Sequence, residues 1–91
     1  MRQLETALIG AGLIARMHLE AWIAAGASVR VHSLDGRAAE LAAEFGVKAV
    51  DSLEEALDGA DAVDICSPTD THREIALAAI ARAARSGRWV W

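Results

Sequence analysis

The sequence of 91 residues has little cysteine and little proline, with one residue of each. A single cysteine, Cys66, cannot form an internal disulfide, so nothing points to an oxidising compartment. No run approaches the ~20 apolar residues that a membrane-spanning helix requires, and the first five residues lack the apolar core of a signal peptide. We therefore expect a cytoplasmic protein without a membrane partner.

An excess of positive charge is also absent, because the formal net charge is -4 at pH 7. Nucleic acids are attracted by basic surfaces, so the composition predicts no nucleic-acid partner. Four arginines gather in the last quarter of the chain, and we interpret them as a solvated helix face: Arg73, Arg82, Arg85 and Arg88. The length accommodates one domain and not two.

Short apolar runs alternate with longer amphipathic stretches along the chain. The apolar runs predict five strands, at residues 4–9, 29–31, 47–50, 62–66 and 89–91. The amphipathic stretches predict four helices, at residues 13–25, 37–45, 53–57 and 71–85. This alternation favours a parallel sheet with right-handed crossovers. We predict an α/β fold, a Rossmann-type open sheet in the order 3-2-1-4-5 with helices on both faces.

Two of the predicted helices carry further local signals. Ser52 and Glu55 have the spacing of a capping box at the start of the third helix. The helix at 71–85 is predicted to turn an apolar side inward, made of Ile75, Ala79, Ile80 and Ala83.

A G-x-G-x-x-A turn, Gly10-Ala11-Gly12-Leu13-Ile14-Ala15, lies between the first strand and the first helix. Gly10 permits the tight turn, and Gly12 lets the backbone approach a pyrophosphate. The N–H groups that begin the helix, around Leu13 and Ile14, would then hold the phosphates. The turn therefore predicts nucleotide binding, with tight packing alone as the alternative.

The end of the second strand should supply the residue that contacts the adenosine ribose. Asp35 could accept a hydrogen bond from a 2′-hydroxyl and favour NAD, or it could cap the second helix. If His32 and Ser33 occupy the ribose position instead, no carboxylate opposes a 2′-phosphate, and Arg37 or His32 could support NADP. The cofactor is predicted to be NAD or NADP, with a slight lean to NADP.

Four segments together resemble the glucose-fructose oxidoreductase and inositol dehydrogenase (Gfo/Idh/MocA) family, over about the first third of a typical member. They are the glycine turn with Met17-His18, then Ala42-Ala43-Glu44-Phe45-Gly46, Ser52-Leu53-Glu54-Glu55-Ala56-Leu57, and Ala62-Val63-Asp64-Ile65-Cys66-Ser67-Pro68-Thr69-Asp70-Thr71-His72. The last is the most specific, because a Ser-Pro follows the strand and a histidine stands four residues after the proline.

The resemblance implies that the segment after the fourth strand lines the nicotinamide side of the cofactor cleft, through Ser67, Pro68, Thr69 and His72. His72 has an alternative role as a helix-start residue bonded to the backbone. Cys66 precedes this segment and is counted with the cleft, although its apolar strand favours a core position and nothing nearby would activate its thiol. His18 is expected to pack its helix rather than to bind a ligand, and no metal site is predicted.

The chain also departs from the family pattern. The segment from His72 to Gly87 is about one helical turn longer than the family's, and the family's Glu-Lys-Pro motif would follow directly after Trp91. The lysine of that motif contributes to hydride transfer, and a second domain carries the other catalytic groups. We therefore expect residues 1–91 to be a truncated NAD(P)-binding domain that has no catalytic residues and is inactive alone. Counting back from Gly46, the family's ribose-binding acid falls on His32.

The leading hypothesis is the cofactor-binding portion of an NAD(P)-dependent oxidoreductase that acts on a sugar, polyol or related hydroxyl compound. The alternative is a non-catalytic module that binds NAD(P) or a regulatory partner. Glycine turns also serve methyltransferases that bind S-adenosylmethionine, but Ser67-Pro68-Thr69 argues against that class. A homo-oligomer is compatible with either hypothesis.

Overall fold

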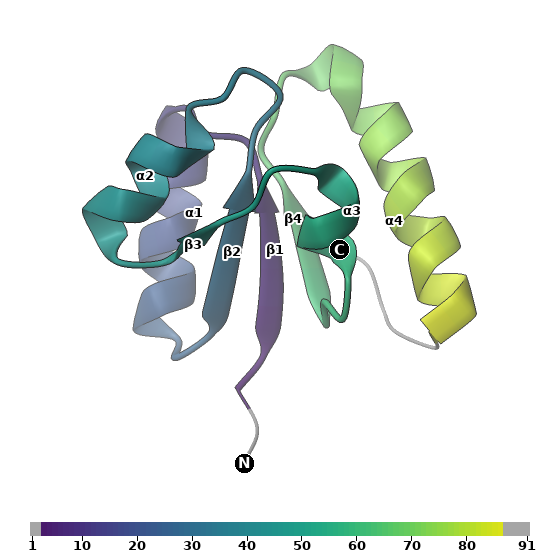
Figure 1. The fold of residues 1–91 in the computed structure, drawn as a ribbon, viewed down its shortest axis with the longest axis horizontal. Helices are drawn as coiled ribbons and strands as arrows, with labels where there is room; N and C mark the ends of the chain where they lie inside the picture. The colour runs from purple at the N-terminus through teal and green to yellow at the C-terminus, as the bar shows by residue number, and fades with distance from the viewer. Residues whose placement is uncertain (1–2, 87–91) are drawn as a thin grey trace.

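The computed structural model describes residues 3–86, which form a four-stranded parallel sheet in the order β3-β2-β1-β4 (Figure 1). The strands are β1 (Glu5–Ile9), β2 (Ser28–His32), β3 (Lys48–Ala49) and β4 (Ala62–Ile65). The predicted α/β class and the strand order 3-2-1-4 are therefore confirmed. The predicted fifth strand at 89–91 lies outside the described residues.

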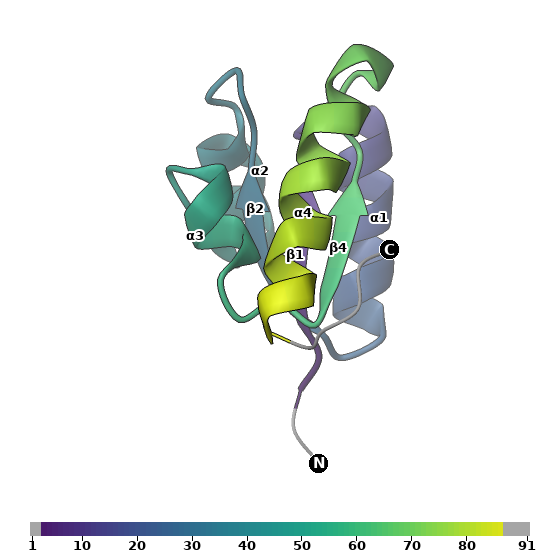
Figure 2. The same ribbon diagram turned by 90° about the vertical axis from the view of Figure 1, so that its right-hand side faces the viewer.

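The helices are α1 (Leu13–Ala24), α2 (Ala38–Phe45), α3 (Leu53–Leu57) and α4 (His72–Ser86), with a short 3₁₀ turn, η1 (Thr69–Thr71), before α4. The predicted bounds of these helices and of the four strands agree with the structure to within one residue. Figure 2 shows α1 and α3 on opposite sides of the sheet. Within residues 3–86, no helix has the length and apolarity that crossing a membrane demands.

Two hydrophobic cores form because successive side chains of a strand point to opposite faces of the sheet. Leu8 of β1 packs with α1 and α2, whereas Ala7 and Ile9 pack with α3 and α4. The first core contains Leu8, Ala15, Leu19, Val29, Val31, Ala38, Leu41 and Ala42. The second contains Ala7, Ile9, Val50, Ala56, Leu57, Ala60, Val63, Ile75 and Ala79.

The local signals of α3 and α4 are confirmed in part. The Glu55 N–H donates to the Ser52 Oγ at 3.1 Å, as expected of the N-cap. Ile75 and Ala79 are buried, but Ile80 is 55% exposed, so its predicted place in the core was wrong. Only a narrow stripe of α4 at i, i+4 spacing, which includes Ile75 and Ala79, is buried against β1, β4 and α3. Ile80 lies about 100° around the helix from Ala79.

The register of the sheet brings the carboxyl ends of three strands to one edge. Ile9 of β1 lies opposite His32 of β2 and Ile65 of β4. The ladders continue past the strands, because the Gly10 N–H donates to the His32 carbonyl at 2.7 Å and the Cys66 N–H donates to the Ile9 carbonyl at 2.7 Å. The three connections that follow β1, β2 and β4 therefore gather at the same end of the molecule (Figure 1).

Candidate functional site

A cleft of about 520 Å³ lies at this end of the sheet. Its lining comes from the three connections that follow β1, β2 and β4. The lining residues are Gly10, Ala11, Gly12, Leu13, Ile14, Ser33, Leu34, Asp35, Arg37, Cys66, Ser67, Pro68, Asp70 and Thr71. Most of the predicted binding residues are therefore brought together around one hollow.

Gly10 makes the turn between β1 and α1 possible. Its φ is +126°, a backbone conformation that side chains strongly disfavour. A Cβ at this position would also lie 2.7 Å from both the carbonyl carbon and the carbonyl oxygen of Cys66, and 2.9 Å from the nitrogen of Ser67. Glycine is required here because the first turn passes directly against the end of β4.

Gly12 forms the N-cap of α1 with extended backbone, φ −83° and ψ −166°. Among the described residues, no side chain caps this helix end, and the first turn of α1 carries no acidic residue. The first N–H groups of a helix have no partner within the helix, and they form the positive end of its dipole. Since Leu13 and Ile14 line the cleft, this helix end is open to an anion there.

The connection after β2 contributes an ion pair between Asp35 and Arg37. The Asp35 carboxylate accepts from the Arg37 Nε at 2.7 Å and from the Arg37 backbone N–H at 3.1 Å. These bonds from Arg37, with one from Ser33, lower the pKa of Asp35 to about 2. Ser33 is buried, and its Oγ accepts from the N–H of Ala38, the first residue of α2. Ser33 and Asp35 therefore both accept backbone N–H groups at the start of this helix. The Arg37 guanidinium reaches to 4.0 Å from where a Cβ on Gly12 would lie.

His32 lies beneath this connection and not in the cleft lining of the described chain. Its ring is buried, and its Nδ1 lies 3.1 Å from the carbonyl oxygen of Val50. Its backbone contacts the glycine turn directly, because the His32 carbonyl oxygen accepts a hydrogen bond from the Gly10 N–H.

The segment after β4 is held in shape by its own hydrogen bonds. The Ser67 and Thr71 hydroxyls lie 2.7 Å apart, and the Thr71 hydroxyl donates to the Pro68 carbonyl at 2.7 Å. The His72 Nε2 lies 2.6 Å from the Ser67 carbonyl oxygen. The structure thus gives His72 its alternative role, bonded to the backbone at the start of α4. Ser67 and Pro68 line the cleft, whereas Thr69 and His72 are not among its described lining residues.

Cys66 lies at the junction of cleft and core. Its side chain lines the cleft and packs partly against the core beneath α1 and α2. Burial raises the pKa of the Cys66 thiol to about 12, and the negative charge and hydrogen bond of Asp64 add to this effect. The thiol is therefore protonated at neutral pH and is not an activated nucleophile.

We expect Cys66 to react slowly with thiol reagents. At pH 8, in the presence of a chelator, iodoacetamide should alkylate it at least ~100-fold more slowly than free cysteine, because its thiolate fraction is so small. The rate is measurable by mass spectrometry without ambiguity, since the chain has one cysteine. Asp64→Asn should accelerate the reaction by removing the adjacent charge. A rate equal to that of free cysteine would contradict the raised pKa.

Four residues of the lining were missed by sequence analysis: Ala11, Leu34, Asp70 and Thr71. Each is a sequence neighbour of a residue that was selected. The available signal was the fold itself, because every residue in a connection at the carboxyl edge of a parallel sheet is a candidate to line the cleft.

Known proteins share both this sequence pattern and this fold. The model of the oxidoreductase family with an NAD-binding Rossmann fold, GFO_IDH_MocA, matches residues 4–85. An inositol 2-dehydrogenase of Rhizobium meliloti is 36% identical over 92% of this chain and 26% of its own length. A UDP-N-acetylglucosamine 3-dehydrogenase of Acidithiobacillus ferrooxidans is 36% identical over 84% of this chain and 25% of its own length.

Solved structures agree with these matches. A structure of the Acidithiobacillus ferrooxidans dehydrogenase superposes with a TM-score of 0.83 at 34% identity, covering 99% of this chain and 28% of that one. An NAD-binding protein from Listeria innocua superposes with a TM-score of 0.76 at 27% identity, covering 98% of this chain and 26% of that one. The chain spans about a quarter of the length of the curated relatives it matches. Because the family model covers nearly all of it, the chain belongs to the Gfo/Idh/MocA oxidoreductase family and forms its NAD-binding Rossmann fold.

Proposed function

We propose that the cleft binds NADP(H), and that the chain is the cofactor-binding portion of an oxidoreductase that acts on a hydroxyl group of a sugar, polyol or related compound. The observation that carries this proposal is the uncapped start of α1, open at the carboxyl edge of the sheet between β1 and β4. Ligands of open α/β sheets bind at such a point, where the crossovers diverge to opposite faces. The substrate class follows from the sugar and inositol dehydrogenases among the relatives.

The pyrophosphate would lie over the glycine turn. Gly12 presents backbone without a side chain, and the N–H groups at the start of α1 offer hydrogen bonds to phosphate oxygens. No carboxylate in the first turn of α1 opposes a bound phosphate. The nicotinamide half would then extend toward Ser67 and Pro68, the lining residues that follow β4.

The adenosine end would meet the pair formed by Asp35 and Arg37. Arg37 carries a guanidinium beside the glycine turn, and guanidinium groups bind phosphate with good geometry. The Asp35 carboxylate already accepts two hydrogen bonds from Arg37, so the guanidinium of Arg37 balances the negative charge of Asp35. These contacts support a 2′-phosphate at this position and hence NADP(H) over NAD(H).

Isothermal titration of the 91-residue chain with NADPH, NADH and S-adenosylmethionine tests the function. We expect NADPH to bind tightest, NADH more weakly, and S-adenosylmethionine not at all. Binding of S-adenosylmethionine alone would assign the turn to a different cofactor class. Binding of none of the three would favour the non-catalytic interaction module.

The choice between the two nicotinamide cofactors is tested at Arg37. Arg37→Ala should weaken NADPH binding by about tenfold, the value of one exposed charge-assisted hydrogen bond, and leave NADH binding within about twofold. Arg82→Ala is the matched control, because Arg82 lies on α4 and pairs with Asp58 away from the cleft. The opposite result would be that Asp35→Ala weakens NADH binding while Arg37→Ala leaves NADPH binding unchanged. Asp35 would then contact the ribose, and NAD(H) would be the cofactor.

A further inference from the structure

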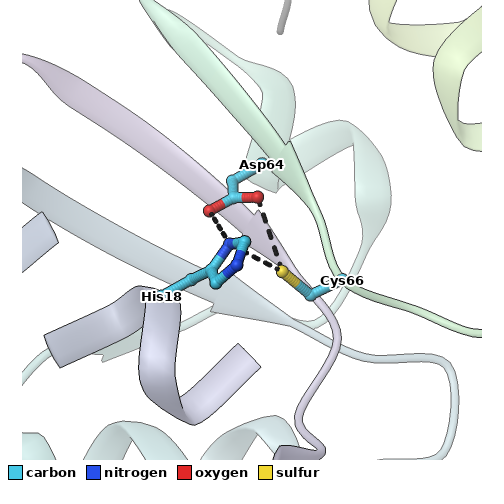
Figure 3. Close-up of side chains that lie close together, drawn as sticks. All are labelled: His18, Asp64 and Cys66. Atoms are coloured by element: carbon cyan, nitrogen blue, oxygen red, sulfur yellow. Dashed lines mark hydrogen bonds and ion pairs between the residues drawn. The ribbon is translucent and has the colours of Figure 1, made fainter. Parts of the chain in front are cut away.

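Three side chains of different chemistry converge between α1 and the end of β4 (Figure 3). His18 projects from α1, while Asp64 and Cys66 come from β4 and the residue just after it. The His18 Nδ1 lies 2.8 Å from the Asp64 Oδ2 and 3.3 Å from the Cys66 Sγ. The Cys66 Sγ lies 3.4 Å from the Asp64 Oδ1, so the three groups form a closed triangle.

The fold accounts for this convergence. Residues two apart on a strand point to the same face, so Asp64 and Cys66 both face α1. On α1, His18 and Trp22 stand one turn apart and present a common side to that face. The Trp22 Nε1 donates to the Asp64 Oδ2 at 2.8 Å. An acid in an otherwise apolar strand thus contacts two polar side chains from a helix more than 40 residues earlier in the chain.

We propose that His18, Asp64 and Cys66 form a binding site for one divalent transition-metal ion, with Zn²⁺ as the best match. Imidazole nitrogen, thiolate sulfur and carboxylate oxygen are the ligands that Zn²⁺ takes in proteins. Tetrahedral coordination at the usual Zn–N and Zn–S lengths separates neighbouring ligand atoms by roughly 3.4–3.6 Å. The Cys66 Sγ lies 3.3 Å from the His18 Nδ1 and 3.4 Å from the Asp64 Oδ1, close to this range. The 2.8 Å contact of His18 is with the other carboxylate oxygen, Oδ2, and one ligand atom from each of the three residues lies within 4.8 Å of the other two.

Metal binding balances the charges of the three groups. A cysteine binds a metal ion as the thiolate. On binding, the S–H bond breaks, a metal–sulfur bond forms and one proton passes to solvent. Neutral His18 binds through Nδ1 with its proton on Nε2. The two negative ligands then cancel the charge of the dication, which suits a half-buried site.

The surroundings provide both support and access. The Asp64 side chain is 16% exposed and is oriented by Trp22, in the way that outer groups orient metal ligands. The His18 side chain is 49% exposed, which leaves room for a water molecule as the fourth ligand and a path for the ion. A bound ion would cross-link α1 to the end of β4.

Cobalt provides the direct test, because Co²⁺ occupies zinc sites and reports its ligands by absorption. We expect the tag-free 91-residue chain to bind one Co²⁺, with a thiolate-to-cobalt charge-transfer band and the visible bands of tetrahedral coordination. Zn²⁺ should displace the cobalt and bleach the spectrum. In weakly buffered solution, an indicator dye should record proton release on metal binding, since the cysteine binds as the thiolate. Thermal unfolding should shift upward with Zn²⁺ and return with a chelator.

Variants assign the ligands. Cys66→Ser should abolish the charge-transfer band, and His18→Asn should weaken Zn²⁺ binding by at least ~10-fold, since even loss of an outer partner costs that much. Trp22→Phe should weaken binding by about 10-fold while retaining the band, as expected of a positioning residue. Glu20→Gln is the matched control, since it removes an exposed ligand group from the same helix outside the cluster.

Two outcomes would overturn the proposal. The first is a wild-type chain that shows no charge-transfer band with Co²⁺, which would leave a hydrogen-bonded cluster without metal. The second is a band or proton release that persists in His18→Asn at wild-type affinity. Either result is independent of cofactor binding, because the spectra are recorded without nucleotide.

Discussion

Gly10→Ala should cost this protein about 2–6 kcal/mol of its free energy of unfolding. The new Cβ would sit 2.7 Å from the backbone of Cys66, at a residue whose φ is +126°. Strain at such a φ costs about 1–3 kcal/mol, and overpacking against an unyielding neighbour costs about 1–3 kcal/mol more. A domain of this size has a total of roughly 5–14 kcal/mol. Urea unfolding followed by far-ultraviolet circular dichroism measures the loss.

Gly26→Ala separates the two causes. Gly26 has a φ of +84°, but apart from its chain neighbours no atom of residues 3–86 lies within 4 Å of the position of its Cβ. Its replacement therefore introduces strain without a clash and should cost about 1–2 kcal/mol. Equal losses in the two variants would show that the approach of the glycine turn to β4 contributes nothing to the requirement for glycine.

Gly12→Ala should leave the fold nearly intact and weaken NADPH binding by about 10- to 100-fold. Its φ of −83° is open to any residue, and the nearest atom to a new Cβ is the Arg37 guanidinium at 4.0 Å. Stability should therefore change by less than about 1 kcal/mol, the scale of exchanging an N-cap residue. The methyl group would instead occupy the space where the pyrophosphate meets the backbone, at an overpacking cost of about 1–3 kcal/mol.

Titration with NADPH and urea unfolding of the same preparation distinguish these effects. Gly12→Ala with normal stability and weak binding would support the proposed place of the pyrophosphate. Normal binding by a folded Gly12→Ala chain would remove the pyrophosphate from the turn. Gly10→Ala should show the opposite pattern, with a lower free energy of unfolding. The two variants together would then identify Gly10 as the glycine that the fold requires and Gly12 as the glycine that cofactor binding requires.

The sequence by itself determined the elements and their order. Apolar periodicity, glycine ends and the capping pair are local features, so β1 through α4 were predicted to within one residue of their observed bounds. The order 3-2-1-4 followed from general rules of chain connection. The glycine turn located the cleft, because Gly10 and Gly12 act mainly through their own backbone and the helix that begins there.

Only the tertiary structure decided which side chains meet. It set the His32 ring against the Val50 carbonyl, left Ile80 exposed and joined Asp64 to His18. Local patterns contain no information on these pairings, because the direction of a side chain depends on twist, register and neighbours from distant segments. Backbone geometry follows short-range forces that the sequence displays directly, whereas the chemistry of a site depends on which distant groups the packed fold brings within bonding distance.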